Sequence, residues 1–288
     1  MSSMKLSAVF SRVVMTVAFS LCVFGNAYAS VQVLDFTTAA NGDVISNGQI
    51  IDDEYSEWGV TVSSCSLNGS QMTEANHING NCVGGTENVS VAFDTSLSGT
   101  LDPDLEFVFD NGVYRANEGS QDIYEPLQIA GAGAGPGSVL ILHERPYECS
   151  NGVCANPDDE GTRPAGFFAF DFAEPTAIVS LDFFDIEYNE ANTATKVSSL
   201  YFHLSDGSIV QSDVVDTGDG GYERVEYANM FDVVKLVVNM PGSGAINNLV
   251  FGQNPTVVTP VSAPAVLGML MLSFSYLARR SRYRFSRK

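Results

Sequence analysis

Acidic side chains in predicted loops are the residues of this chain best suited to chemistry. Asp102 and Asp104 flank a proline in one turn, and Asp158, Asp159 and Glu160 follow one another in a later loop. Carboxylate oxygens are the ligands that calcium prefers, and loops between strands can bring several of them onto one ion. We therefore expect these five residues to form a calcium site, and calcium is the candidate cofactor.

A second candidate calcium set consists of Asp35, Asp43 and Asn247, near the two ends of the predicted domain. The first and last strands of jelly-roll domains are often neighbours, so these residues could share a structural ion. Neither set has the spacing of a defined calcium loop. A solvated acidic surface is the alternative interpretation of both.

No catalytic residue is predicted. The chain has 34 acidic residues, and a catalytic pair of carboxylates cannot be selected from so many without a cleft and a fixed separation. A Gly-x-Ser-x-Gly motif is absent, and His143-Glu144 lacks the second histidine of a zinc-protease helix. We expect a protein that is not an enzyme, with a secreted polysaccharide hydrolase as the alternative.

Aromatic side chains offer a third kind of chemistry, because their faces can stack on sugar rings. In an alternating strand the same residues are more often part of the core. The candidates for stacking are Tyr55, Trp58, Tyr114, Tyr124, Tyr201 and Tyr222.

Four cysteines lie in the predicted exported part of the chain, and an even number in such a chain predicts disulfides. Three pairings are possible. We favour Cys65 with Cys82 and Cys149 with Cys154, because residues 150–153 can turn tightly and close a small loop. Zinc is the alternative, but the three histidines show no ligand spacing relative to these cysteines.

Charge is distributed unevenly along the chain. The formal net charge is −20, but all 34 acidic residues lie between the two hydrophobic ends, with only six basic residues among them, a net charge of −28. Binding to nucleic acid needs clustered lysine and arginine, so we expect no nucleic-acid partner.

Alternating hydrophobic residues predict short β-strands throughout residues 30–252, and no segment there has a helical period. Residues 206–207, Asp-Gly, predict a tight hairpin turn, and residues 64–88 and 110–137 predict loops. We expect an all-β fold, a β-sandwich of jelly-roll type similar in pattern to galactose-binding-like domains. The predicted strands are residues 31–36, 58–63, 89–93, 105–109, 138–142, 168–172, 179–183, 200–204, 208–210, 234–240 and 244–251.

The two ends of the chain predict export. Residues 1–29 combine an early Lys5 and Arg12 with an apolar stretch and a small-x-small site at residues 27–29, which is typical of a secretory signal peptide. Residues 253–260 predict a linker. Residues 266–277 form an uncharged apolar run that predicts one transmembrane helix, and an arginine cluster that begins at Arg279 and Arg280 follows it.

The tail of residues 261–288 resembles the PEP-CTERM sorting signal, which joins a short Pro-containing motif, a hydrophobic helix and a terminal arginine cluster. Val261, Pro264 and Ala265 match the family motif Val-Pro-Glu-Pro-Ala, whereas residues 262–263 are Ser-Ala in place of Pro-Glu. The resemblance implies an exosortase-type transpeptidase as a partner, which would remove the helix and transfer the body to the cell surface or exopolysaccharide matrix. A permanent single-pass anchor is the alternative.

These features predict an exported protein of the cell surface or exopolysaccharide matrix, with a structural or adhesive role. Calcium-dependent glycan binding is the activity that such a module could supply.

Overall fold

The computed structural model describes residues 31–253, except residues 72, 121, 130–132, 160–164, 188–198 and 241. The predicted signal peptide, transmembrane helix and sorting residues Val261, Pro264, Ala265, Arg279 and Arg280 therefore lie outside the described residues. Within the described part of the chain, no helix is long and apolar enough to cross a membrane.

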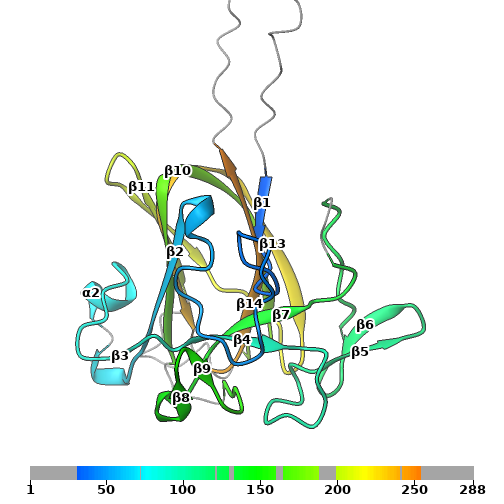
Figure 1. Ribbon diagram of the computed structural model, residues 1–288. Coiled ribbons are helices and arrows are strands. Elements are labelled where there is room, and N and C mark those ends of the chain that lie inside the picture. The colour runs from blue at the N-terminus through cyan, green and yellow to red at the C-terminus, as the bar shows by residue number, and fades with distance from the viewer. Residues whose placement is uncertain are drawn as a thin grey trace, which may run out of the picture.

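The fold is built from β-strands, which confirms the all-β prediction (Figure 1). Helical structure in the described chain is confined to single turns: η1 (Ser56–Trp58), η2 (Gly69–Gln71), α2 (Glu74–His77) and η3 (Pro146–Glu148). The strands are β1 (Val31–Leu34), β2 (Val60–Ser66), β3 (Thr86–Glu87), β4 (Ser90–Asp94), β5 (Phe107–Asp110), β6 (Val113–Ala116), β7 (Ser138–Leu142), β8 (Cys149–Ser150), β9 (Val153–Cys154), β10 (Gly166–Phe184), β11 (Ser199–Leu204), β12 (Ile209–Asp213), β13 (Tyr222–Met240) and β14 (Ala245–Gln253).

Two strands of 19 residues, β10 and β13, run side by side through the main sheet. The sequence predicted two separate strands, residues 168–172 and 179–183, where β10 is continuous, and it missed the first half of β13. The register of β10 against β13 shifts between Asp171 and Thr176, around Pro175. Proline has no N–H to donate to a ladder, so the strand bends there and continues with a new register.

The bend gives each half of β10 a different set of neighbours. The first half pairs with β2 and with the end of β13, whereas the second half pairs with β14 and with the start of β13. The path through the sheet is β12-β11-β13-β10-β14-β7-β4, with β1 added to β14 and β2 to β10. Side chains from both halves, such as Phe170 and Phe183, meet in one main core.

The alternation of buried and exposed residues along β10 departs from the prediction in two ways. The first half is buried on both faces, because Phe167 and Ala169 pack in a smaller core beneath the segment of α2. In the second half, a register shift between Ile178 and Ser180 turns Val179 outward, so that it is 43% exposed. The register shift therefore removes Val179 from the face that it was predicted to share with Leu181.

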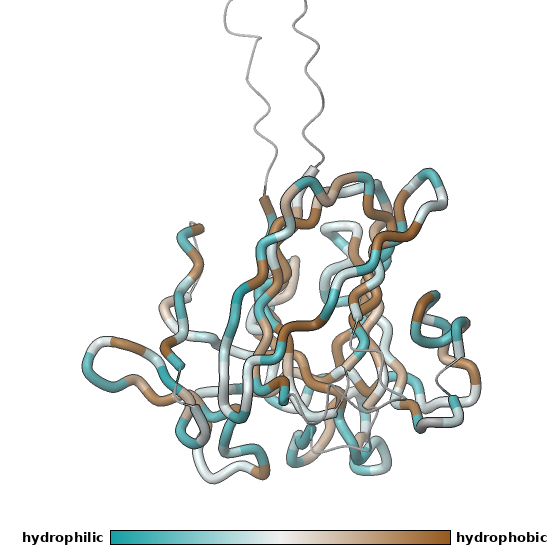
Figure 2. Tube along the Cα trace, turned by 180° about the vertical axis from the view of Figure 1, so that it is seen from behind, coloured by the Kyte–Doolittle hydropathy of each residue, from teal (hydrophilic) through white to brown (hydrophobic). Residues whose placement is uncertain are grey.

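Hydrophobic residues are concentrated along the strands of the sheet, and hydrophilic residues along the connecting loops (Figure 2). The strands β5 and β6 form a separate hairpin that projects to one side of the molecule, and α2 lies on the opposite side (Figure 1).

Both predicted disulfides are present. Cys65 in β2 is bonded to Cys82 in the following loop, and Cys149 is bonded to Cys154 across the β8–β9 hairpin. The first disulfide fixes the segment that carries α2, and the second closes a turn of only a few residues.

The first and last strands of the described chain, β1 and β14, are neighbours. β1 pairs antiparallel with β14, with Val31 opposite Gly252 and Leu34 opposite Leu249. Val31 and Gly252 therefore lie side by side, so the two ends of the described domain lie at the same end of the sheet (Figure 1).

Candidate functional site

Three of the five predicted calcium ligands lie together at one end of the sheet. Asp102 and Asp159 are almost fully buried, and the backbone N–H of Asp159 donates to Asp102 Oδ2 at 3.2 Å. Asp104, half-buried, lies in the same turn as Asp102 and contributes to the electrostatic potential at its carboxyl group. These three predicted residues therefore lie close to one another, and calcium binding by them stays a prediction.

Of the other two predicted ligands, the structure describes Asp158. Asp158 accepts a salt bridge of 2.6 Å from Arg145, next to the β8–β9 hairpin, so its carboxylate is directed to an arginine. Glu160 lies outside the described residues.

The structure adds two carboxylates that the sequence did not single out. Oxygens of Asp104, Asp185 and Asp219 all lie within 4.8 Å of one another. Phe184 is paired with Tyr222 on one side and with Ala245 on the other, so the residues just beyond these strand ends meet at one edge. We call Asp102, Asp104, Asp159, Asp185 and Asp219 the acidic cluster.

A sequence signal was available for Asp219 but not for Asp185. Residues 216–221, Asp-Thr-Gly-Asp-Gly-Gly, form a short acidic and glycine-rich loop before β13. Asp185 has a positive φ of 53°, and its Oδ1 accepts a hydrogen bond of 2.6 Å from the N–H of Gly220. The loop is thus fastened to the end of β10 by this carboxylate.

Burial is the largest cause of the raised pKa values of Asp102 and Asp185 in the cluster. It raises the pKa of Asp102 to about 10, and the neighbouring Asp159 and Asp158 carboxylates add to the shift. It also raises the pKa of Asp185 to about 9, with further contributions from Asp104 and Asp159. Carboxylates in such surroundings either take up protons or need a bound cation.

The second predicted calcium set is engaged locally. Asp35 Oδ1 accepts hydrogen bonds from the N–H groups of Thr37 and Thr38, each at 3.0 Å. Asp43 is exposed and accepts from Asn41, whereas Asn247 is buried and donates to the carbonyl of Pro136. No hydrogen bond among the described residues joins Asp35, Asp43 and Asn247.

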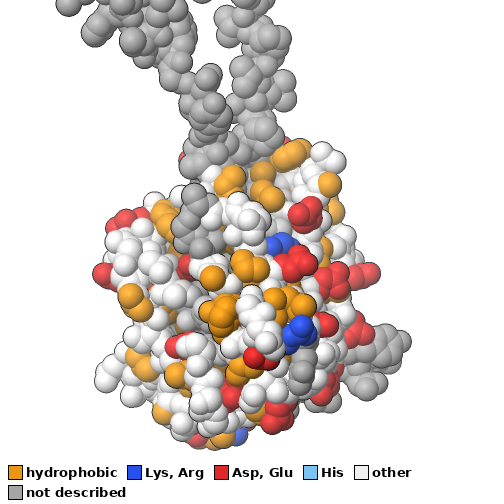
Figure 3. All heavy atoms as spheres, turned by 90° about the vertical axis from the view of Figure 1, so that its right-hand side faces the viewer, with side chains coloured by type: hydrophobic (Ala, Val, Ile, Leu, Met, Phe, Trp, Pro, Cys, Tyr) orange, Lys and Arg blue, Asp and Glu red, His pale blue; other side chains and the backbone are white. Residues whose placement is uncertain are grey.

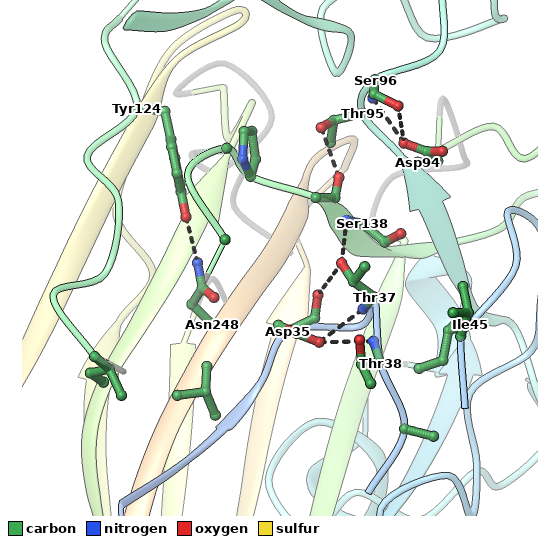
Figure 4. Close-up of a pocket in the computed structure, with 18 of the residues that line it drawn as sticks. Asp35, Thr37, Thr38, Ile45, Asp94, Thr95, Ser96, Tyr124, Ser138 and Asn248 are labelled. Carbon is green, nitrogen blue, oxygen red and sulfur yellow. Dashed lines mark hydrogen bonds between the residues drawn. The ribbon is translucent and has the colours of Figure 1, made fainter. Parts of the chain in front are cut away.

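A second site is an open cleft of about 890 Å³ beside β1. Figure 4 shows its polar wall, where Asp35, Thr37 and Thr38 lie near Ser138, and Asp94 lies at the end of β4. The N–H of Ser138 donates to Thr37 Oγ1 at 2.9 Å, which connects the two segments. We call this cavity the β1 cleft.

Tyr124 and Asn248 form the opposite side of the β1 cleft (Figure 4). Asn248 Nδ2 donates to Tyr124 Oη at 2.9 Å and to Asp182 Oδ2 at 2.8 Å. Asp182 is fully buried and is held by two bonds from Arg224, of 2.6 and 2.7 Å. Burial raises the pKa of Asp182, and the Arg224 guanidinium opposes that shift.

The six predicted aromatic candidates divide into two groups. Trp58, Tyr114 and Tyr124 line the β1 cleft. Tyr55 is a core residue whose Oη accepts the N–H of Phe36, and Tyr201 packs in the smaller core. Tyr222 lies against Tyr124, with ring centroids 5.0 Å apart.

Comparison of the sequence with protein-family models and with curated proteins finds no match. The geometry of the two sites is therefore the basis for any functional assignment.

One further group contains a histidine, His143, close to Cys149 and Cys154. Both cysteines are oxidised in a disulfide, so their sulfur atoms are not available as thiolate ligands. This group does not fit a zinc ion.

Proposed function

We propose that this chain is an exported protein of the cell surface or exopolysaccharide matrix, and that the β1 cleft binds a neutral glycan. The tail that resembles a PEP-CTERM signal would deliver the protein through an exosortase-type transpeptidase. The body would be a β-sandwich of jelly-roll, galactose-binding-like type, an assignment supported by the main core between the two halves of the bent sheet.

The composition of the β1 cleft carries the proposal. Its walls combine hydroxyl and carboxylate groups with the rings of Trp58, Tyr114 and Tyr124, and no lysine or arginine is found among the described lining residues. Sugars offer many hydroxyls that donate to carboxylates and apolar faces that stack on rings. An anionic ligand would meet Asp35 and Asp94 without a compensating cation.

The surface of the molecule agrees with a neutral ligand. Acidic side chains outnumber basic ones over the face in Figure 3. Among residues 30–252 there are 34 acidic and six basic residues. A field of this sign repels acidic polysaccharides and leaves neutral ones unaffected.

Affinity electrophoresis of the full chain in gels that contain neutral or acidic polysaccharides tests the proposal. We expect retardation by a neutral polysaccharide alone. Replacing the half-buried Tyr114 by alanine should weaken binding about fivefold, which corresponds to the loss of one stacking contact of about 1 kcal/mol.

The matched control is Tyr147→Ala, because Tyr147 is 80% exposed and does not line the cleft. Retardation by acidic polysaccharides alone, or equal effects of the two variants, would contradict the proposal. Release of new reducing ends from the polysaccharide would support the rival assignment as a hydrolase.

A further inference from the structure

The acidic cluster gathers carboxylates from four segments that are distant in sequence. Asp102 and Asp104 come from the turn before β5, Asp159 from the segment before β10, Asp185 from the end of β10 and Asp219 from the loop before β13. None of these residues lines the β1 cleft. The cluster is therefore a separate feature that glycan binding does not explain.

The spacing of the central carboxylates suits a calcium ion. Oxygens of Asp104, Asp185 and Asp219 lie within 4.8 Å of one another. Ligands of one calcium ion lie about 2.3 to 2.6 Å from the metal, so oxygens on opposite sides are separated by about 5 Å. Magnesium prefers shorter bonds of about 2.0 to 2.1 Å and retains several waters, so it fits this spacing less well.

A second, independent observation points to a cation. Asp102 is 1% exposed, and its Oδ1 has no hydrogen-bond partner among the described residues. Buried polar atoms are nearly always paired, because an unpaired one costs about 1 to 3 kcal/mol. The other oxygen, Oδ2, accepts from the N–H of Asp159, so this carboxyl group lies directly against the Asp159 segment.

Backbone N–H groups orient the remaining walls of the cluster. Asp159 Oδ2 accepts from the N–H of Gly244 at 2.5 Å, just before β14, and Asp185 Oδ1 accepts from the N–H of Gly220. Gly244 has a φ of +117°, and a Cβ there would lie 3.0 Å from the carbonyl oxygens of Phe184 and Asp185. Only glycine allows the start of β14 to approach the cluster this closely.

We propose that the acidic cluster is a calcium site, in which Asp104, Asp185 and Asp219 supply the central oxygens and the buried carboxyls of Asp102 and Asp159 complete its inner wall. The ion would connect the end of β10 to the starts of β13 and β14 and to the turn before β5. It would thereby fasten together the strand ends that close this end of the sheet.

Calorimetric titration of the calcium-free full chain, purified in detergent, tests the site. We expect saturable calcium binding and a Tm that rises with calcium until the site is filled. Magnesium at the same concentrations should raise the Tm less, and an equal rise would overturn the assignment to calcium.

Asp219→Asn is the informative variant, because Asp219 is exposed and its loss should leave the fold intact. We expect the calcium affinity to fall about tenfold or more, since the ligand charge sets affinity at such sites. The matched control is Asp216→Asn, which removes the same charge from another exposed residue of the same loop. The control should change the affinity less than about twofold.

Three further results would overturn the proposal. The first is the absence of saturable calcium binding by the full chain. The second is an equal loss of affinity in Asp219→Asn and Asp216→Asn, which would indicate nonspecific attraction. The third is an unchanged calcium affinity in Asp102→Asn, which would assign that carboxyl to a proton shared with Asp159. Glycan binding can succeed or fail independently of all three.

Discussion

The negative charge of the buried Asp182 carboxylate is paired with the guanidinium group of Arg224. Arg224 holds it with two short bonds, and the side chain of Asp182 is fully buried. Removing one partner of a buried ion pair leaves an uncompensated charge, at a cost of about 3 to 5 kcal/mol. We expect Arg224→Ala to lower the free energy of unfolding by about that amount, measured by urea denaturation.

Lys235→Ala is the matched control for this prediction. Lys235 pairs with Asp171, whose side chain is 48% exposed. Exposed pairs contribute about 0 to 1 kcal/mol, so the control should lose no more than that. Similar losses in both variants would mean that burial does not govern the contribution of Asp182.

The raised pKa values in the acidic cluster predict how stability changes with pH when no calcium is bound. Asp102 and Asp185 have folded-state pKa values of about 10 and about 9, above the value of 3.8 for an unperturbed aspartate. The folded protein therefore keeps protons that the unfolded chain has released. Stability should therefore fall as the pH rises from about 4 to about 9.

Thermal unfolding in calcium-free buffer between pH 5 and pH 9 checks this sign. The decline should be smaller for Asp185→Asn, which removes one of the two groups, and smaller again for the native chain with saturating calcium. A Tm that rises with pH in calcium-free buffer, with the same profile in Asp185→Asn, would contradict the prediction.

At the scale of elements, the two disulfides close loops of different length. Cys65 and Cys82 are 17 residues apart, and Cys149 and Cys154 are five apart. A longer loop gains more from closure, about 3 kcal/mol for the first against about 2 kcal/mol for the second. We expect the double variant Cys65→Ser/Cys82→Ser to lose more stability in guanidinium denaturation than Cys149→Ser/Cys154→Ser. The reverse order would contradict the loop-closure argument.

The short strands were predictable because the alternation of hydrophobic and polar residues is a sufficient signal for them. β4, β7, β11 and β14 lie within a few residues of their predicted positions. The length of β10 was not predictable in this way, since residues 174–175, Glu-Pro, interrupt the alternation and are read as a break. The strand continues because the paired β13 spans the irregular stretch.

Part of the acidic cluster was predictable from loop position, but its full membership was not. Asp102, Asp104 and Asp159 lie in acidic loops between predicted strands. Asp185 and Asp219 join them only because β10, β13 and β14 end in register. Asp158 lies in the same acidic loop as Asp159, but its carboxylate forms a salt bridge with Arg145.

At the scale of the whole molecule, the resemblance of the tail to a sorting signal makes a prediction about the mature protein. Mass spectrometry of the mature protein from cells should find an N-terminus near Ser30, as the signal-peptide prediction requires. We also expect the helix of residues 266–277 and the arginine cluster to be missing. An intact C-terminus would contradict sorting and would leave the protein as a single-pass membrane anchor.

The pairing of β1 with β14 has a mechanical consequence. β14 ends at Gln253, the side on which any attachment through the tail would pull, and it is hydrogen-bonded to β10 along one edge and to β1 and β7 along the other. Antiparallel hydrogen bonds lie perpendicular to the strands, so tension along β14 strains both rows in shear instead of opening them one by one. A domain tethered in this way would resist forced unfolding when a load pulls on its body.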